Sequence, residues 1–205
     1  MPTDMVDRWA DRSEPGPGQG LLYWHMLLHD QPQVQALAKL GQDRLAAFPG
    51  LHLVPSKWLH ITTLIAGTTD EITAEEADRM VAVAERLLAQ TPPIKVIFGR
   101  VLYHPQAIML GVQPAEILSP LLDVVQTATR GATGRDGTID HRPWTPHATL
   151  AYSTRAQPAA PIIAALGREL PGCEVSINSV SLVVQEGPER LWDWRPIATI
   201  PFGVR

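Results

Sequence analysis

Two hydrophobic periods alternate along the chain, and together they predict strands and helices in a regular order. Short apolar runs rich in β-branched and aromatic residues predict strands over residues 21–29, 58–67 and 94–103. Apolar positions at helical spacing predict helices over residues 31–48 and 73–90 between those strands. The first half of the chain therefore has the predicted order strand, helix, strand, helix, strand.

The predicted helices carry apolar faces and start signals. The face of the first helix consists of Val34, Leu37, Ala38, Gly41 and Leu45. The face of the second consists of Ala77, Met80, Val81, Ala84, Leu87 and Leu88. Thr73 and Glu76 have the spacing of a capping box at the start of the second helix.

The same order begins again in the second half of the chain. Strands are predicted over 107–112 and 147–153, and helices over 119–130 and 157–170, with Ser119 as the expected cap of the first of these helices. Closing strands are predicted over 174–187 and 190–202. Corresponding elements of the two halves are separated by about 86 residues, which indicates an architectural repeat.

The repeat predicts an α+β fold with two lobes related by a pseudo-twofold axis, each lobe a βαβαβ unit. Two antiparallel sheets are expected to face a central cleft, with the helices outside. We expect residues 21–205 to form one bilobal domain, with lobes from about 21–103 and 104–205. The stretch YHPQ at 103–106 is interpreted as the turn that joins the lobes.

Each half places a histidine and a threonine two residues apart in a predicted strand: His60 with Thr62, and His147 with Thr149. Residues two apart on a strand share a face, so both pairs are expected to converge in the cleft. A neutral imidazole can accept a proton from a nucleophile, and a protonated one can donate a proton to a leaving group. Threonine hydroxyls can donate hydrogen bonds to phosphate oxygens. The pairs therefore favour displacement at the phosphorus of a phosphodiester, without a metal or another cofactor.

Composition limits the alternatives. The formal net charge of −4 argues against a protein that coats nucleic acid by bulk electrostatics. No apolar run approaches the roughly 20 residues of a membrane helix, and the charged, Pro- and Gly-rich residues 1–20 are interpreted as a flexible leader rather than a signal peptide. The single cysteine, Cys173, excludes an internal disulfide framework. We expect a cytoplasmic monomer that does not interact with membranes.

Two stretches also resemble the signatures of the two-histidine (2H) phosphoesterases, the superfamily of 2′-5′ RNA ligase-like proteins and cyclic nucleotide phosphodiesterases. HITTLIAG resembles the first signature, His-x-Thr-Leu-x-aromatic-Leu-Gly, through His60, Thr62 and Gly67. WTPHATLAY resembles the second, aromatic-x-Pro-His-x-Thr-Leu-Ala, through Trp144, Pro146, His147, Thr149, Leu150 and Ala151. The resemblance covers residues 21–202. It implies that one histidine is the general base, that the other is the general acid, and that the two threonines hold the phosphate.

The chain departs from the family pattern at a few positions. Thr63 and Ile65 replace an apolar and an aromatic residue, and Tyr152 with Ser153 stands where relatives often carry a basic residue. The contacts to phosphate or base are therefore expected to differ near Tyr152.

Other residues are candidates for lining the cleft. Tyr23 and His25 lie on the first strand, beside the expected motif strand, although a buried core histidine is the alternative for His25. Tyr103 and His104 could stack on a base, against the alternative of a turn with an aromatic anchor. Arg142 could pair with a substrate phosphate or form a surface salt bridge.

The resemblance predicts an enzyme that opens 2′,3′-cyclic phosphates or cleaves 2′-5′ linkages in small nucleotides or RNA ends. RNA 2′-5′ ligation is the same chemistry in reverse and stays open. A protein that binds or senses nucleotides without turnover is the alternative from another class, and a structural interaction module is a third. The sequence does not assign the base and acid roles to the individual histidines.

Overall fold

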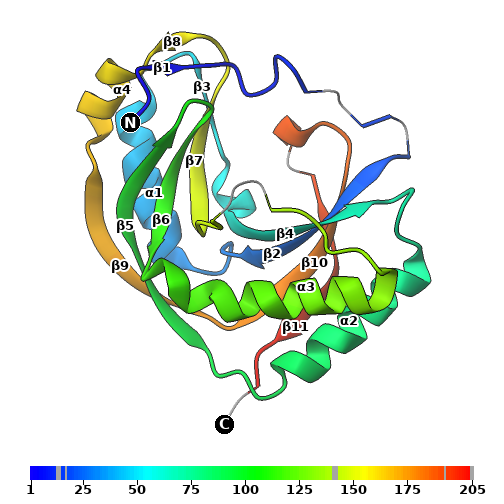
Figure 1. Ribbon diagram of the computed structural model, residues 1–205. Helices are drawn as coiled ribbons and strands as arrows, with labels where there is room; N and C mark the ends of the chain where they lie inside the picture. Colours follow the sequence, from blue (N-terminus) through cyan, green and yellow to red (C-terminus); the bar gives the residue numbers. More distant parts are fainter. Residues whose placement is uncertain (13–14, 17, 140–142, 192, 204–205) are drawn as a thin grey trace.

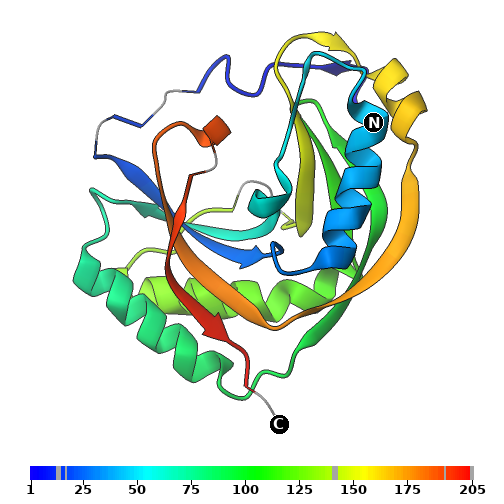
Figure 2. The same cartoon turned by 180° about the vertical axis from the view of Figure 1, so that it is seen from behind.

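Two wings of antiparallel sheet, with helices on their outer faces, make up the computed structural model (Figures 1 and 2). The structure describes residues 1–12, 15–16, 18–139, 143–191 and 193–203. The strands join in the order β11-β10-β2-β4-β7-β6-β5-β9, and β3 (Leu51–Leu53) pairs with β7 on the side. The wings meet at β4 (His60–Thr68) and β7 (His147–Ser153), which pair through Ile61 and Ala148. The α+β, bilobal architecture is the predicted one.

The first wing consists of β11 (Arg195–Pro201), β10 (Ser179–Glu186), β2 (Gly20–Leu27) and β4. Helices α2 (Ala74–Leu88) and α3 (Ser119–Thr133) cover it, with α2 against β11 and α3 against β4. A hydrogen bond from the buried indole Nε1 of Trp24 to the hydroxyl of Thr129, at 3.1 Å, fixes α3 to β2. Burying this large side chain with its one donor satisfied stabilises the contact between the helix and the sheet.

The second wing consists of β7, β6 (Ala107–Gln113), β5 (Ile94–His104) and β9 (Glu169–Ile177). Helix α1 (Pro32–Leu45) packs on β9 and β7, and it also contacts α4 (Ala159–Leu166). All five residues of the predicted apolar face of α1 are buried. The 3.6-residue pattern of that segment therefore identifies the face of the helix that is buried against the rest of the protein.

The starts of the helices are only partly as predicted. Thr73 and Glu76 form the predicted capping box of α2, in which each side chain bonds to the other residue's backbone N–H. On the same helix Leu87 is exposed, although the pattern assigned it to the apolar face. Ser119 is the first residue of α3 rather than its cap: Leu118 occupies the cap position and forms no side-chain bond there.

The lobes do not coincide with the two halves of the sequence, which corrects the predicted boundary near residue 104. Helix α1 and strand β5 come from the first half of the chain but belong to the second wing. Helix α3 and strand β10 come from the second half but belong to the first wing. Residues 103–106 consequently form a hairpin turn between β5 and β6 within one wing, and they do not join the lobes.

The segment predicted as one closing strand over residues 174–187 is two strands. Asn178 separates β9, which pairs with β5, from β10, which pairs with β2. A continuous β-type pattern does not reveal this break, because both strands alternate in the same way on either side of it. The chain passes from one wing to the other at this residue.

Residues 1–12 are attached to the second wing, contrary to the predicted flexible leader. Strand β1 (Asp4–Met5) pairs with β8 (Gln157–Pro158), and the Met5 side chain is fully buried. The backbone N–H of Val6 donates to Pro105 O at 2.8 Å, and that of Arg8 donates to Ser153 O at 2.9 Å. One buried apolar side chain and paired backbone groups outweigh the loop-like composition of this segment.

No helix within the described part of the chain is long and apolar enough to span a membrane.

Candidate active site

The two motif histidines have the same local geometry. Nδ1 of His60 lies 2.7 Å from Trp58 O, and Nδ1 of His147 lies 2.7 Å from Thr145 O, so each ring bonds to the carbonyl two residues before it. A carbonyl oxygen can only accept, and therefore Nδ1 carries a proton in both rings. In both residues Nε2 is then the nitrogen that can exchange a proton with a substrate.

A β-bulge follows the threonine of each motif. Between β2 and β4 the register skips Thr63, and between β6 and β7 it skips Leu150. Each bulge leaves His and Thr of its motif on the cleft face, and the next residue, Thr63 or Leu150, is buried. The bulges thus repeat with the motifs and aim both pairs at the same space.

Both histidines and both threonines line one cavity of about 60 Å³ between the wings. The structure therefore brings His60, Thr62, His147 and Thr149 together. Tyr152 also lines this cavity, and its hydroxyl donates to Oγ1 of Thr149 at 3.3 Å. Since Oγ1 of Thr149 accepts this bond, its own hydrogen can point to a bound anion.

Aromatic side chains surround His60. The centroid of its ring lies 4.2 Å from that of His25 and 4.5 Å from that of Trp194, and Tyr23 stacks on the far side of His25 at 5.0 Å. Burial is the main cause that lowers the pKa of His60 to about 4, and the nearby His147 lowers it further, against the bond to Trp58. His60 is therefore neutral at pH 7.

His25 is a buried histidine that also contacts the site. Its side chain is 2% exposed, and burial followed by the neighbouring His60 lowers its pKa well below the ordinary value. His25 stays neutral, and its ring supports His60 from behind. The two interpretations of His25, core residue and cleft residue, therefore both describe its position.

A larger apolar cavity of about 270 Å³ adjoins the cavity of about 60 Å³, and the two share Arg8, Thr62, His147, Thr149 and Tyr152. The predicted cleft residues Tyr103 and His104 line it, together with Ala107, Met109 and Trp144. The Trp144 indole donates to Thr62 O at 3.1 Å, which fixes this wall to the motif strand. The Tyr103 hydroxyl donates to Gly167 O, and burial raises the pKa of this tyrosine to about 12, so the hydroxyl stays protonated. Arg142 lies outside the described residues.

Four residues at the site were not predicted: Arg8, Arg12, Glu189 and Trp194. Arg8 and Arg12 lie in the segment interpreted as a leader, and both line the cavity of about 60 Å³. Glu189 also lines it and raises the pKa of His60 through its charge. Trp194 lies in the stretch RLWDW, whose alternating tryptophans are typical of side chains that cover a sheet. Nothing in the local sequence of the other three signals that they reach the cleft.

The described residues contain no group of three or more His, Cys, Asp or Glu side chains that could hold a metal ion.

Comparisons with known proteins place the chain in a family. Residues 28–189 match the family model of the 2′-5′ RNA ligase superfamily. No curated protein sequence matches the chain.

Solved structures with the same fold come from several sources. TT0787 of Thermus thermophilus is 20% identical with a TM-score of 0.68, covering 90% of this chain and 100% of that one. LigT of E. coli, complexed with ATP, is 14% identical with a TM-score of 0.66, covering 91% and 99%. The PDE domain of MHV ns2 is 13% identical with a TM-score of 0.59, covering 82% and 99%.

Proposed function

Because the chain belongs to the 2′-5′ RNA ligase superfamily, we propose that it is a phosphodiesterase that needs no metal and uses His60 and His147 as general base and general acid. Its substrates are 2′,3′-cyclic phosphates or 2′-5′ phosphodiesters in small nucleotides or RNA ends. The observation that carries the proposal is the matched geometry of the two rings. Both Nδ1 atoms are tied to a carbonyl, and both rings line the cavity that the two threonines also line.

The environment of His60 supports its assignment as the general base. His60 is neutral at neutral pH, so its Nε2 can accept the proton of the attacking water. The water oxygen bonds to phosphorus while the bond from phosphorus to the ribose oxygen breaks. Protonated His147 gives its Nε2 proton to that leaving oxygen. The proton gained by His60 and the one lost by His147 balance over the reaction, and exchange with solvent restores both rings.

The threonines stabilise the charge on the non-bridging oxygens. Thr62 on β4 and Thr149 on the neighbouring β7 line the same cavity, so both hydroxyls can donate to the phosphate. The bond from Tyr152 orients Thr149 for this purpose. Crystal structures of E. coli LigT with ATP, 3′-AMP and NADP⁺ support a nucleotide as the substrate class.

Hydrolysis of 2′,3′-cyclic nucleotides and 2′-5′ dinucleotides in EDTA tests the proposal. We expect turnover by the wild type and losses of about 10²–10⁴-fold in kcat/KM for His60→Ala and for His147→Ala. His29→Ala is the control, since His29 is exposed and lines neither cavity. The acidic limb of the kcat/KM profile is expected near pH 4, the pKa of His60 in the free enzyme.

The same assay contains the outcomes that would contradict the proposal. Activity abolished by EDTA would require a metal, and activity retained in both alanine variants would remove the histidines from the mechanism. Tight binding of the panel without turnover would instead indicate a nucleotide-binding protein.

A further inference from the structure

A third cavity, of about 310 Å³, lies on the other side of the catalytic one. It shares four lining residues with the catalytic cavity: Arg12, Tyr23, Gln185 and Glu189. The catalytic cavity therefore lies between two larger spaces, one lined by Ala107 and Met109 and the other partly closed by the N-terminal segment. Each larger space is near the lower end of the roughly 300–1,000 Å³ typical of small-molecule sites.

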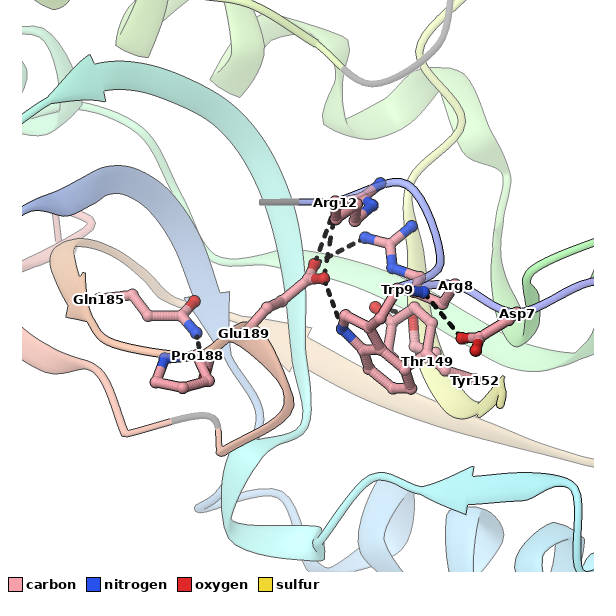
Figure 3. Close-up of polar contacts among 9 residues, drawn as sticks. All are labelled: Asp7, Arg8, Trp9, Arg12, Thr149, Tyr152, Gln185, Pro188 and Glu189. Atoms are coloured by element: carbon pink, nitrogen blue, oxygen red, sulfur yellow. Dashed lines mark hydrogen bonds and ion pairs between the residues drawn. The ribbon is translucent and has the colours of Figure 1, made fainter. Parts of the chain in front are cut away.

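Side chains that bind anions surround this third cavity. Glu189 accepts from Nη2 of Arg8 at 2.7 Å and from the indole Nε1 of Trp9 at 3.1 Å (Figure 3). Nη1 of Arg12 lies 3.5 Å from both of its carboxylate oxygens. Two guanidinium groups, those of Arg12 and Arg190, line this cavity together with the carboxylates of Asp11 and Glu189. Donors from the N-terminal segment thus already converge on a pair of anionic oxygens.

Arg12 differs from Arg8 in its freedom to move. The Arg8 side chain is 13% exposed, holds Glu189 at short distance and lies 4.6 Å above the Tyr152 ring. The Arg12 side chain is 44% exposed, and its contacts to Glu189 are at the outer limit of a hydrogen bond. An exposed ion pair of this length contributes little, so Arg12 can turn to another anion at small cost.

Flat aromatic faces complete the third cavity. Trp9 and Tyr23 line it, and the Arg190 guanidinium lies 5.3 Å from the centroid of the Trp9 ring. Aromatic rings and arginine planes are the surfaces on which nucleobases stack. The cavity therefore offers both a surface for a base and a cation for a phosphate.

We propose that Trp9, Arg12, Tyr23, Gln185, Glu189 and Arg190 form a subsite, the N-terminal subsite, for a second nucleotide unit of the substrate that bears its own phosphate. The inference rests on the proposed function. A linear phosphodiester has a group on each side of the scissile phosphate, and the two larger cavities provide a space for each. Trp9 and Arg12 precede residue 28, where the family match begins, so this part of the subsite comes from the chain's own N-terminal segment.

The test compares 2′-5′-linked diadenosine monophosphate with the same compound carrying a terminal phosphate at its 5′ or 3′ end. The wild type is expected to prefer one phosphorylated form by about tenfold in kcat/KM, which corresponds to one charge-assisted contact. Arg12→Ala is expected to reduce this ratio to about one. Arg86→Ala, which removes an exposed arginine from the outer helix α2, is expected to keep the ratio.

Binding measurements separate failure of the subsite from failure of the proposed function. Calorimetry of His147→Ala with the three compounds reports the phosphate preference without any turnover, and adding Arg12→Ala reports the contribution of that residue. Equal affinities or equal kcat/KM values for the compounds with and without terminal phosphate would overturn the subsite, as would a preference that survives Arg12→Ala. Absence of turnover with an intact, Arg12-dependent binding preference would overturn the phosphodiesterase alone.

Discussion

The two motif strands carry the same chemistry in different surroundings. His60 and Thr62 on β4 correspond to His147 and Thr149 on β7, and both pairs are followed by a bulge. The residues opposite them on the neighbouring strands differ: His25 pairs with Thr62, whereas Met109 pairs with Thr149. Two residues further along β2 and β6, Tyr23 pairs with Ile65, whereas Ala107 pairs with Tyr152.

This difference shows how two equivalent motifs can have unlike environments. On β2 the stacked rings of Tyr23 and His25 fill the space behind His60, and burial there lowers the pKa of His60. On β6 the alanine and the thioether at the matching positions leave the cavity of about 270 Å³. The repeat supplies two histidines in matched positions, and their unlike neighbours bury His60 and leave an open cavity beside His147.

The largest effect that tests this comparison comes from the threonines. If Thr62 and Thr149 are equivalent, Thr62→Val and Thr149→Val should each lower kcat by about 10- to 100-fold, the effect of losing a hydrogen bond to a charged group. Substitution by Val retains the shape and the β-branch of the side chain. Equal losses in steady-state kinetics would support equivalence, whereas a loss in only one variant would show that one strand holds the phosphate alone.

Exchanging the unlike neighbours gives a smaller effect. Ala107→Tyr places on β6 the residue found at the matching position of β2, and its ring is expected to fill the apolar cavity. We expect KM to rise about tenfold with kcat nearly unchanged, because bound substrate loses contacts that are the same in the ground and transition states. Ala82→Tyr on the exposed face of α2 is the control, and thermal unfolding of both variants checks the fold. An unchanged KM would exclude this cavity from substrate binding.

The smallest effect concerns His25, on the side of the site that aromatic rings fill, and its contribution to the free energy of unfolding. His25 has a lowered pKa in the folded state, so the unfolded chain binds one more proton below its ordinary pKa of about 6.5. The contribution of neutral His25 is therefore present above that pH and is lost as the pH falls below it. His25→Phe should reduce the pH slope of the unfolding free energy below pH 6.5 by about 1.4 kcal/mol per pH unit, measured by urea denaturation. An unaltered slope would mean that His25 accepts its proton without unfolding.

The sequence predicted which motif residues meet in the cleft better than it predicted how the elements are connected. The spacing of His60 and Thr62 and its recurrence at His147 sufficed to place four polar groups together, because strand geometry alone puts residues two apart on one face. The offset of about 86 residues also gave the bilobal fold. The sequence did not predict that α1 packs on the second wing and α3 on the first. An apolar face shows that a helix packs, but it does not show on which sheet the helix packs.

The remaining misses have the same physical cause. Arginine is usually exposed, and Arg8 and Arg12 lie in a segment whose composition is typical of a loop. Only the pairing of β1 with β8 and the burial of Met5 bring them to the cleft. Glu189 and Trp194 reach it from the connection between β10 and β11. A contact between residues 181 positions apart, such as Arg8 and Glu189, leaves no periodic trace in a single sequence.

The exchange of elements between the wings has a consequence for how the chain can be divided. A fragment that ends at the β5–β6 hairpin would carry β5 and α1 without the strands β6, β7 and β9 on which they pack, and its β2 would lack β10. The other fragment would lack β5 and α1, and its β10 would lack β2. Neither fragment can bury its own apolar surface, but each holds the pieces that the other lacks. The two should therefore reassemble when coexpressed, and the catalytic pair would form only in that reassembled molecule.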